Sequence, residues 1–93
     1  MGYFVYILYS ENFDRYYIGQ TKEISTRLKR HNDRLESFTK AYVPWRLECV
    51  VEKPTRAEAM ILERKLKNLN RKRILDFIEK YGGVRGFESA DEA

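Results

Sequence analysis

Five side chains in this sequence are of types that together could hydrolyse a phosphodiester bond. Tyr6 and Tyr17 supply phenols, and His31 supplies an imidazole, each of which can activate or position a water molecule. The guanidinium of Arg27 can pair with phosphate oxygens and stabilise a pentavalent transition state. The carboxylate of Glu63 can hold a hard divalent cation such as Mg²⁺, which keeps several of its waters.

Each of these side chains also has a purely structural explanation, which the residue types leave open. Tyrosines commonly pack in a core with the hydroxyl reaching water, and a histidine on an apolar stripe is commonly a hydrogen-bonded core residue. Arg27 could be solvated, and Glu63 could pair with Lys67, four residues later on a helix. The residue types alone are therefore a weak indication of a site.

The two tyrosines fall in a predicted β-hairpin at the start of the chain. Residues 3–9 are an unbroken apolar and aromatic run, typical of a strand that is covered on both faces. Residues 16–20 form a second short strand after a polar turn, and Gly19 within it indicates a close backbone approach or a bulge. If the register places Tyr6 and Tyr17 on one face, their phenols lie close together.

The helix predicted next carries both Arg27 and His31. Thr21 is the expected N-cap of a helix over residues 22–34. Because Arg27 lies one turn before His31, both side chains lean toward one side of that helix. His31 falls on the apolar stripe of the helix, which we expect to consist of Ile24, Leu28 and Leu35.

The remaining segments predict a loop, one more strand and two more helices. The loop covers residues 36–45 and the strand covers residues 46–51. Thr55 and Glu58 form a capping box for a helix to about Leu69, whose buried stripe is Ala59, Leu62, Leu66 and Leu69, with Glu63 at its border. The last helix, over residues 72–81, is expected to bury Ile74, Phe77, Ile78 and Tyr81.

This order of elements predicts an α+β fold with a three-stranded, mostly antiparallel sheet packed with about three helices. The 93 residues suffice for one small domain, over residues 1–81, followed by a flexible acidic tail over residues 82–93. The tail carries one arginine against three carboxylates, so of the total net charge of +4 the domain holds +6. Such a charge attracts polyanions, nucleic acid above all, although it could also only keep the surface soluble.

Composition excludes several other classes of protein. The one cysteine and one histidine exclude a disulfide framework and zinc sites built from several cysteines or histidines. No apolar run is long enough for a membrane span, and the N-terminal residues lack the features of a signal peptide. We therefore expect no membrane partner and a cytoplasmic location, with association with the nucleoid left open.

Several short motifs follow one another over residues 3–79. They are Val5-Tyr6-Ile7, Tyr17-Ile18-Gly19, Gln20-Thr21, Arg27-Leu28 with His31, Pro44-Trp45-Arg46-Leu47, and Arg56-Ala57-Glu58-Ala59 with Glu63. With this spacing and order the sequence resembles the GIY-YIG endonuclease superfamily. Within it, the sequence is most similar to small stand-alone bacterial members that resemble the nuclease domain of the excision-repair endonuclease. It departs from the family pattern at Val5, where the first triplet usually opens with glycine.

The resemblance implies a Mg²⁺- or Mn²⁺-dependent endonuclease that nicks one DNA strand, linked to DNA repair or recombination. Tyr6 then matches the tyrosine that acts at the nucleophilic water, and Tyr17 the tyrosine that supports it. Arg27 matches the arginine that binds the scissile phosphate, and His31 matches a position that assists proton transfer or contacts the phosphate. Glu63 matches the single acidic residue that anchors the metal.

Basic residues elsewhere could then bind the DNA backbone without reading its sequence. They lie on the Arg27 helix, in the loop and around the last two helices: Lys29, Arg30, Arg34, Lys40, Arg64, Lys65, Lys67, Arg71, Lys72 and Arg73. A solvated surface is the alternative for this set. Trp45 is favoured as a lid on the core over a platform for base stacking.

Two other functions stay open beside the nuclease. One is a nucleic-acid-binding module of the same fold that does not cut. The other is a nuclease-fold subunit of a larger repair assembly, with a targeting or repair protein as its partner. The preferred DNA structure, the use of RNA and the oligomeric state are not predicted.

Overall fold

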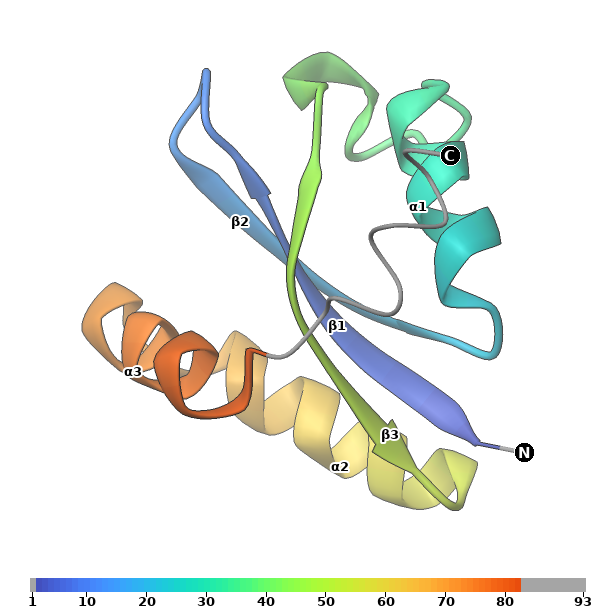
Figure 1. Cartoon of the computed structure of the whole chain (residues 1–93), viewed down its shortest axis with the longest axis vertical. Coiled ribbons are helices and arrows are strands. Elements are labelled where there is room, and N and C mark those ends of the chain that lie inside the picture. The colour runs from blue at the N-terminus through green and yellow to red at the C-terminus, as the bar shows by residue number, and fades with distance from the viewer. Residues whose placement is uncertain (1, 83–93) are drawn as a thin grey trace.

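Three antiparallel strands form a sheet that separates α1 on one face from α2 and α3 on the other (Figure 1). The computed structural model describes residues 2–82. In chain order its elements are β1 (Tyr3–Ser10), β2 (Arg15–Thr21), α1 (Ile24–Asn32), the 3₁₀ helix η1 (Lys40–Tyr42), β3 (Arg46–Lys53), α2 (Arg56–Lys67) and α3 (Arg71–Tyr81). The strand order is β2-β1-β3, which makes β2 an edge strand. This architecture confirms the predicted α+β fold.

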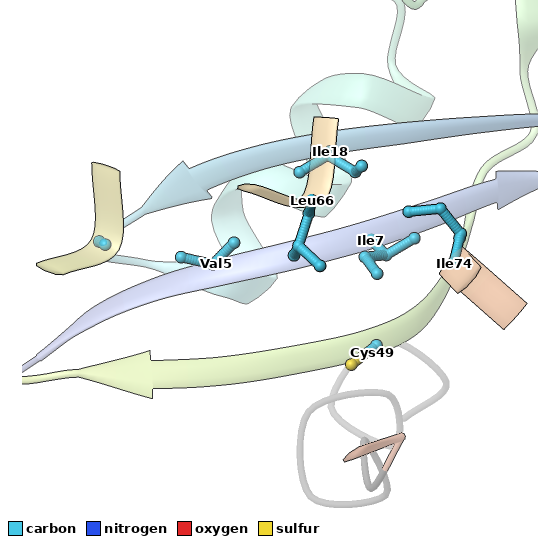
Figure 2. Close-up of a cluster of buried hydrophobic side chains, with 7 residues drawn as sticks. Val5, Ile7, Ile18, Cys49, Leu66 and Ile74 are labelled. Carbon is cyan, nitrogen blue, oxygen red and sulfur yellow. The ribbon is translucent and has the colours of Figure 1, made fainter. Parts of the chain in front are cut away.

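Strand β1 is the centre of the sheet and is covered on both faces, as its apolar run predicts. Val5 and Ile7 pack with α2 and α3 residues in a cluster that also holds Leu66 and Ile74 (Figure 2). On the other face Tyr6 and Leu8 pack in a second cluster with Ile24 and Leu28 of α1, Leu47 of β3, and Trp45 just before β3. Full burial of an aliphatic side chain contributes about 1.5–3 kcal/mol, so β1 anchors both helical layers.

A β-bulge in β3 lets this strand supply both clusters. Leu47 and Cys49 are two residues apart, so in a regular strand they would point to the same face. The register against β1 shifts between Ile7 and Leu8, whose partners are Cys49 and Leu47. The extra residue, Glu48, rotates the strand, and Leu47 and Cys49 therefore lie on opposite faces.

Helix α1 is two residues shorter at each end than predicted. Thr21 is not its N-cap: Glu23 holds that position without a side-chain cap, and the Thr21 hydroxyl instead accepts a hydrogen bond from the Glu23 N–H at 3.1 Å. This local turn competes with helix formation. The chain turns at Arg34, whose φ is 64°. Leu35 consequently leaves the helix and is 58% exposed, so its place on the buried stripe was predicted wrongly.

The last two helices begin with side-chain caps. The Thr55 hydroxyl accepts a hydrogen bond from the Glu58 N–H, which confirms the predicted cap of α2, and Asn70 caps α3 in the same way. The prediction that Tyr81 is buried is wrong. Its ring lies against Phe77 at the end of α3, with 48% of the residue exposed.

The other predicted boundaries need smaller changes. Strand β3 extends two residues beyond the predicted segment, and η1 forms within the expected loop. Trp45 is 4% exposed and covers the core on the α1 face, as favoured from the sequence. None of the helices within residues 2–82 is long and apolar enough to cross a bilayer. Beyond residue 82, the predicted acidic tail lies outside the described residues.

Candidate active site

Tyr6 and Tyr17 project from the same face of the hairpin. Tyr6 is paired with Gly19 and Tyr17 with Leu8, so the two tyrosines are diagonal neighbours across β1 and β2. Their ring centroids are 6.4 Å apart. The hairpin therefore brings the two phenols together, which is the condition that a shared site needs.

Gly19 makes the space that the Tyr6 phenol occupies. A Cβ atom at this position would lie 2.6 Å from the Tyr6 hydroxyl oxygen and 3.2 Å from the ring of Tyr17. The register of β1 and β2 is regular here, so the glycine marks a close approach and not a bulge. Any larger residue would displace Tyr6.

A buried chain of hydrogen bonds links Tyr6 to α1 and to the following loop. The Tyr6 hydroxyl lies 2.9 Å from Nε2 of His31, and Nδ1 of His31 lies 2.7 Å from the hydroxyl of Thr39. All three residues are at most 1% exposed. The Trp45 indole N–H donates to the carbonyl of Thr39 at 2.9 Å, which fixes the loop. Thr39 holds the imidazole ring in position, a role that no sequence pattern indicated.

Burial sets the protonation states of Tyr6 and His31. Desolvation raises the pKa of Tyr6 well above its usual value, and Tyr17 adds to the effect, while the nearby Arg27 guanidinium opposes it. Desolvation also lowers the pKa of His31, with Arg27 and Arg30 acting in the same direction and Glu36 against them. At neutral pH the phenol is therefore protonated and the imidazole is neutral.

The available partners select one tautomer of His31. Besides the imidazole, the group within hydrogen-bonding reach of the Tyr6 phenol is the Arg27 guanidinium, which has donors only. The Tyr6 O–H must therefore donate to Nε2 of His31. The N–H of His31 then lies on Nδ1 and donates to the Thr39 hydroxyl. In this arrangement the Tyr6 oxygen keeps lone pairs with which to accept a hydrogen bond.

The lowered pKa of His31 predicts a loss of stability in mild acid. The unfolded chain binds a proton at this residue near the usual pKa of 6.5, whereas the folded chain binds it only at lower pH. The free energy of unfolding should then fall as pH drops below about 6.5, with a slope of at most about 1.4 kcal/mol per pH unit. Urea denaturation across this range measures it. A His31→Gln variant should give a flatter curve, and parallel curves for the two proteins would contradict the prediction.

Glu63 comes to the site from the other face of the sheet. It lies on α2, next to the cluster that packs against Val5 and Ile7, and its side chain is 19% exposed. The Gln20 amide of strand β2 donates to one carboxylate oxygen at 2.7 Å, and Lys67 pairs with the other at 2.9 Å. The structure therefore contains the Lys67 pair that was an alternative from the sequence. No direct contact joins Glu63 to the Tyr6–His31 pair.

The edge of β2 is where the two faces meet. One cavity of about 320 Å³ is lined by both Arg27 and Gln20, and a cleft of about 480 Å³ is lined by both Tyr17 and Lys67. Each hollow is thus lined by one residue from the side of the sheet that carries Tyr6 and Tyr17 and by one residue that bonds to Glu63, as Gln20 does, or forms an ion pair with it, as Lys67 does. A strand of nucleic acid lying along this edge could contact all of them.

Among the predicted site residues, Glu63 is the one that could hold a magnesium ion, which would then take its other ligands from water and substrate. Within residues 2–82 no three His, Cys, Asp or Glu side chains gather in a way that could hold a metal. Mg²⁺ is commonly bound through one or two carboxylates together with waters and substrate phosphates. Glu63 also lines an open hollow of about 360 Å³ on α2, which leaves room for such ligands once Lys67 moves aside.

The predicted basic residues are divided between the two faces, and acids from other segments partner several of them. On α1, Lys29 pairs with Asp33 and Arg30 pairs with Glu36. The stretch from Arg64 to Arg73 contains no acid, but Asp14 of the β1–β2 turn reaches Arg71 at 2.8 Å. Within the part of the chain that the structure describes, six of the predicted DNA-binding residues form no salt bridge: Arg34, Lys40, Arg64, Lys65, Lys72 and Arg73.

Comparisons with known proteins agree with this fold. Residues 2–77 match the model of the GIY-YIG catalytic domain. The chain is 30% identical over 84 residues to UPF0213 protein BH0048 of Halalkalibacterium halodurans, covering 89% of this chain and 88% of the relative. It is also similar to the solution NMR structure of UPF0213 protein BH0048 from Bacillus halodurans, with a TM-score of 0.59, 30% identity, and coverage of 89% of this chain and 88% of that one. The chain therefore belongs to the GIY-YIG catalytic domain family, and its fold is a nuclease fold.

Proposed function

We propose that this protein is a metal-dependent DNA endonuclease that nicks one strand and serves DNA repair or recombination. One observation carries the proposal: at the edge of β2, Arg27 lines a hollow together with Gln20, and Tyr17 lines a hollow together with Lys67. Gln20 and Lys67 are the partners of Glu63. A single phosphodiester group at this edge could meet a cationic side chain, a phenol and a carboxylate-bound cation. The fold and the family support a nucleic-acid substrate.

In this proposal Arg27 binds the scissile phosphate. It lines the cavity at the β2 edge and is close enough to Tyr6 to oppose the rise of that pKa. A guanidinium forms two parallel hydrogen bonds with phosphate oxygens and stabilises the charge that builds up on them.

Tyr6 and His31 form the path for the proton of the attacking water. The raised pKa keeps the phenol protonated, so Tyr6 alone is a poor base at neutral pH. As the water attacks phosphorus, its proton passes to the Tyr6 oxygen while the Tyr6 proton passes to Nε2 of His31. The Nδ1–H of His31 meanwhile stays bonded to Thr39, which steadies the imidazolium. The P–O bond to the leaving strand breaks in the same displacement.

Glu63 would hold a Mg²⁺ or Mn²⁺ ion, which supplies Lewis-acid stabilisation of the phosphate and the leaving oxygen when bound. Gln20 orients the carboxylate from β2. Lys67 neutralises it in the free protein and, with 53% of its side chain exposed, is free to turn toward a phosphate.

A cleavage assay tests the proposal. The purified protein is incubated with end-labelled nicked, flapped, branched and single-stranded DNA, with Mg²⁺, Mn²⁺ or a chelator. We expect cuts in one strand that need the metal and are lost in Arg27→Ala. Arg46→Ala is the matched control, because Arg46 pairs with Glu48 and Glu11 and lines neither of the two hollows at the β2 edge. If no substrate is cut above the level of Arg27→Ala, the protein is not this nuclease.

The second candidate is a module that binds nucleic acid without cutting it. It is favoured by one observation, the engagement of both Glu63 oxygens by Gln20 and Lys67. In that case DNA binding would weaken steeply with salt and would not respond to Mg²⁺. The complex would be held by contacts between basic side chains and DNA phosphates, without a metal ion. The same module could serve as a subunit of a repair assembly.

A further inference from the structure

Phe38 is the most exposed large apolar residue in the part of the chain that the structure describes, and it borders the candidate active site. It is 70% exposed. Its ring lies 5.8 Å from that of Tyr17, at an interplanar angle of 37°. The two rings line the cleft of about 480 Å³ together with Lys67. The volume is within the range of about 300–1,000 Å³ that is typical of small-ligand sites.

The loop that carries Phe38 is held in place by its neighbour. Thr39 is fully buried and is bonded through its hydroxyl to His31 and through its carbonyl to the Trp45 indole. The N–H of Tyr42 also donates to this carbonyl at 3.0 Å. Phe38 is therefore exposed on an anchored backbone, so little ordering would be needed to stack a ligand against it.

The other wall of the cleft provides positive charge. Lys67 lines it, and the Arg71 guanidinium lies 5.3 Å from the centre of the Tyr16 ring, which lines the same cleft. An aromatic face beside cations is the combination that binds single-stranded nucleic acid, because bases stack on the ring and phosphates meet the cations. A paired base within a duplex already has its faces covered by its neighbours and must leave the stack to be bound.

We propose that Phe38 and Tyr17 form a subsite that stacks one unpaired nucleobase next to the scissile phosphate. The subsite rests on the proposed nucleic-acid substrate and specifies its class: single strands, flaps and other DNA with unpaired nucleotides are bound in preference to continuous duplex. The nuclease thereby gains a preference for a DNA structure from a residue that takes no part in proton transfer.

Binding to oligonucleotides that contain 2-aminopurine tests this subsite, with a chelator present so that nothing is cut. We expect the wild-type protein to bind the single strand and to quench its fluorescence. Phe38→Ala should weaken single-strand binding about tenfold or more and reduce the quenching, because stacking of one base contributes that much. Duplex affinity should change little, and Phe38→Trp should restore the single-strand affinity.

The matched control is Phe13→Ala, which removes another exposed ring, one that lies 5.4 Å from Tyr42 and outside the cleft. This variant should bind single strands as the wild type does. Equal single-strand affinity for Phe38→Ala and the wild type would overturn the subsite, as would an equal loss for single strand and duplex. Thermal unfolding of each variant verifies that it is folded.

The result also separates this inference from the proposed nuclease. If the wild type shows Phe38-dependent binding but cuts nothing, the nuclease proposal fails and the subsite stands. If the wild type cuts DNA while Phe38→Ala keeps the same preference among single-stranded, flapped and duplex substrates, the subsite fails and the nuclease stands.

Discussion

Replacing Glu63 by glutamine is expected to lower metal-dependent cleavage by at least about 10³-fold, because the carboxylate is the one proposed protein ligand of the cation. The neutral amide has nearly the same shape, so Gln20 can still bond to it. The pair with Lys67 is lost, but a partly exposed pair of this kind contributes only about 0.3–0.5 kcal/mol. Cleavage rates with Mg²⁺ and Mn²⁺, together with thermal unfolding, measure both effects.

Glu58→Gln is the matched control for this substitution. Glu58 lies on the same helix, and its backbone N–H and side chain bond to Thr55 in the capping box. Glutamine is also accepted in a capping box, so neither stability nor cleavage should change appreciably. Titration with Mn²⁺, followed by electron paramagnetic resonance, should show binding that Glu63→Gln loses and Glu58→Gln keeps. Undiminished cleavage by Glu63→Gln would contradict the proposed role of this residue.

The fold could be predicted from the sequence because its local signals agree with its packing. The apolar run of β1 indicated a strand covered on both faces, and Val5 to Leu8 are indeed buried there. The capping box at Thr55 fixed the start of α2. The wrong predictions at Thr21 and Leu35 lie at helix ends, where a side-chain turn and a residue with positive φ override the periodic pattern.

The site was harder to predict, because its parts meet only through tertiary structure. Spacing placed Tyr6, Tyr17 and His31 on neighbouring elements, and the structure brings these three together. The spacing could not indicate that Thr39 bonds to His31, because this contact depends on how the loop after α1 folds back toward the helix. It also could not show that Glu63 approaches from the opposite face, since that depends on how α2 packs on the sheet.

The family resemblance identified the same five residues, whose roles remain a prediction. What the structure adds is the connection between them: the Tyr6 phenol is bonded to an imidazole that burial keeps neutral. A tyrosine with a raised pKa needs such an acceptor before it can take a proton from water. This dependence of Tyr6 on His31 can be measured.

Tyr6→Phe is expected to lower the cleavage rate by about 10²- to 10⁴-fold, the usual contribution of general acid–base catalysis. It also leaves Nε2 of the buried His31 without a partner, which costs about 1–3 kcal/mol of stability, so rates are compared below the unfolding temperature of the variant. Tyr9→Phe is the control on the same strand. The Tyr9 hydroxyl bonds to Asp14 in the turn, so cleavage should not change.

The double variant Tyr6→Phe/His31→Gln decides whether the two residues act as one unit. A glutamine at position 31 can still hydrogen-bond but cannot take up a proton, so this single change should also slow cleavage. If the proton passes from Tyr6 to His31, the second substitution removes a step that the first has already blocked. The double variant should then lose no more than the more damaging single variant. Losses that multiply would mean that Tyr6 and His31 contribute independently, and would contradict the shared proton path.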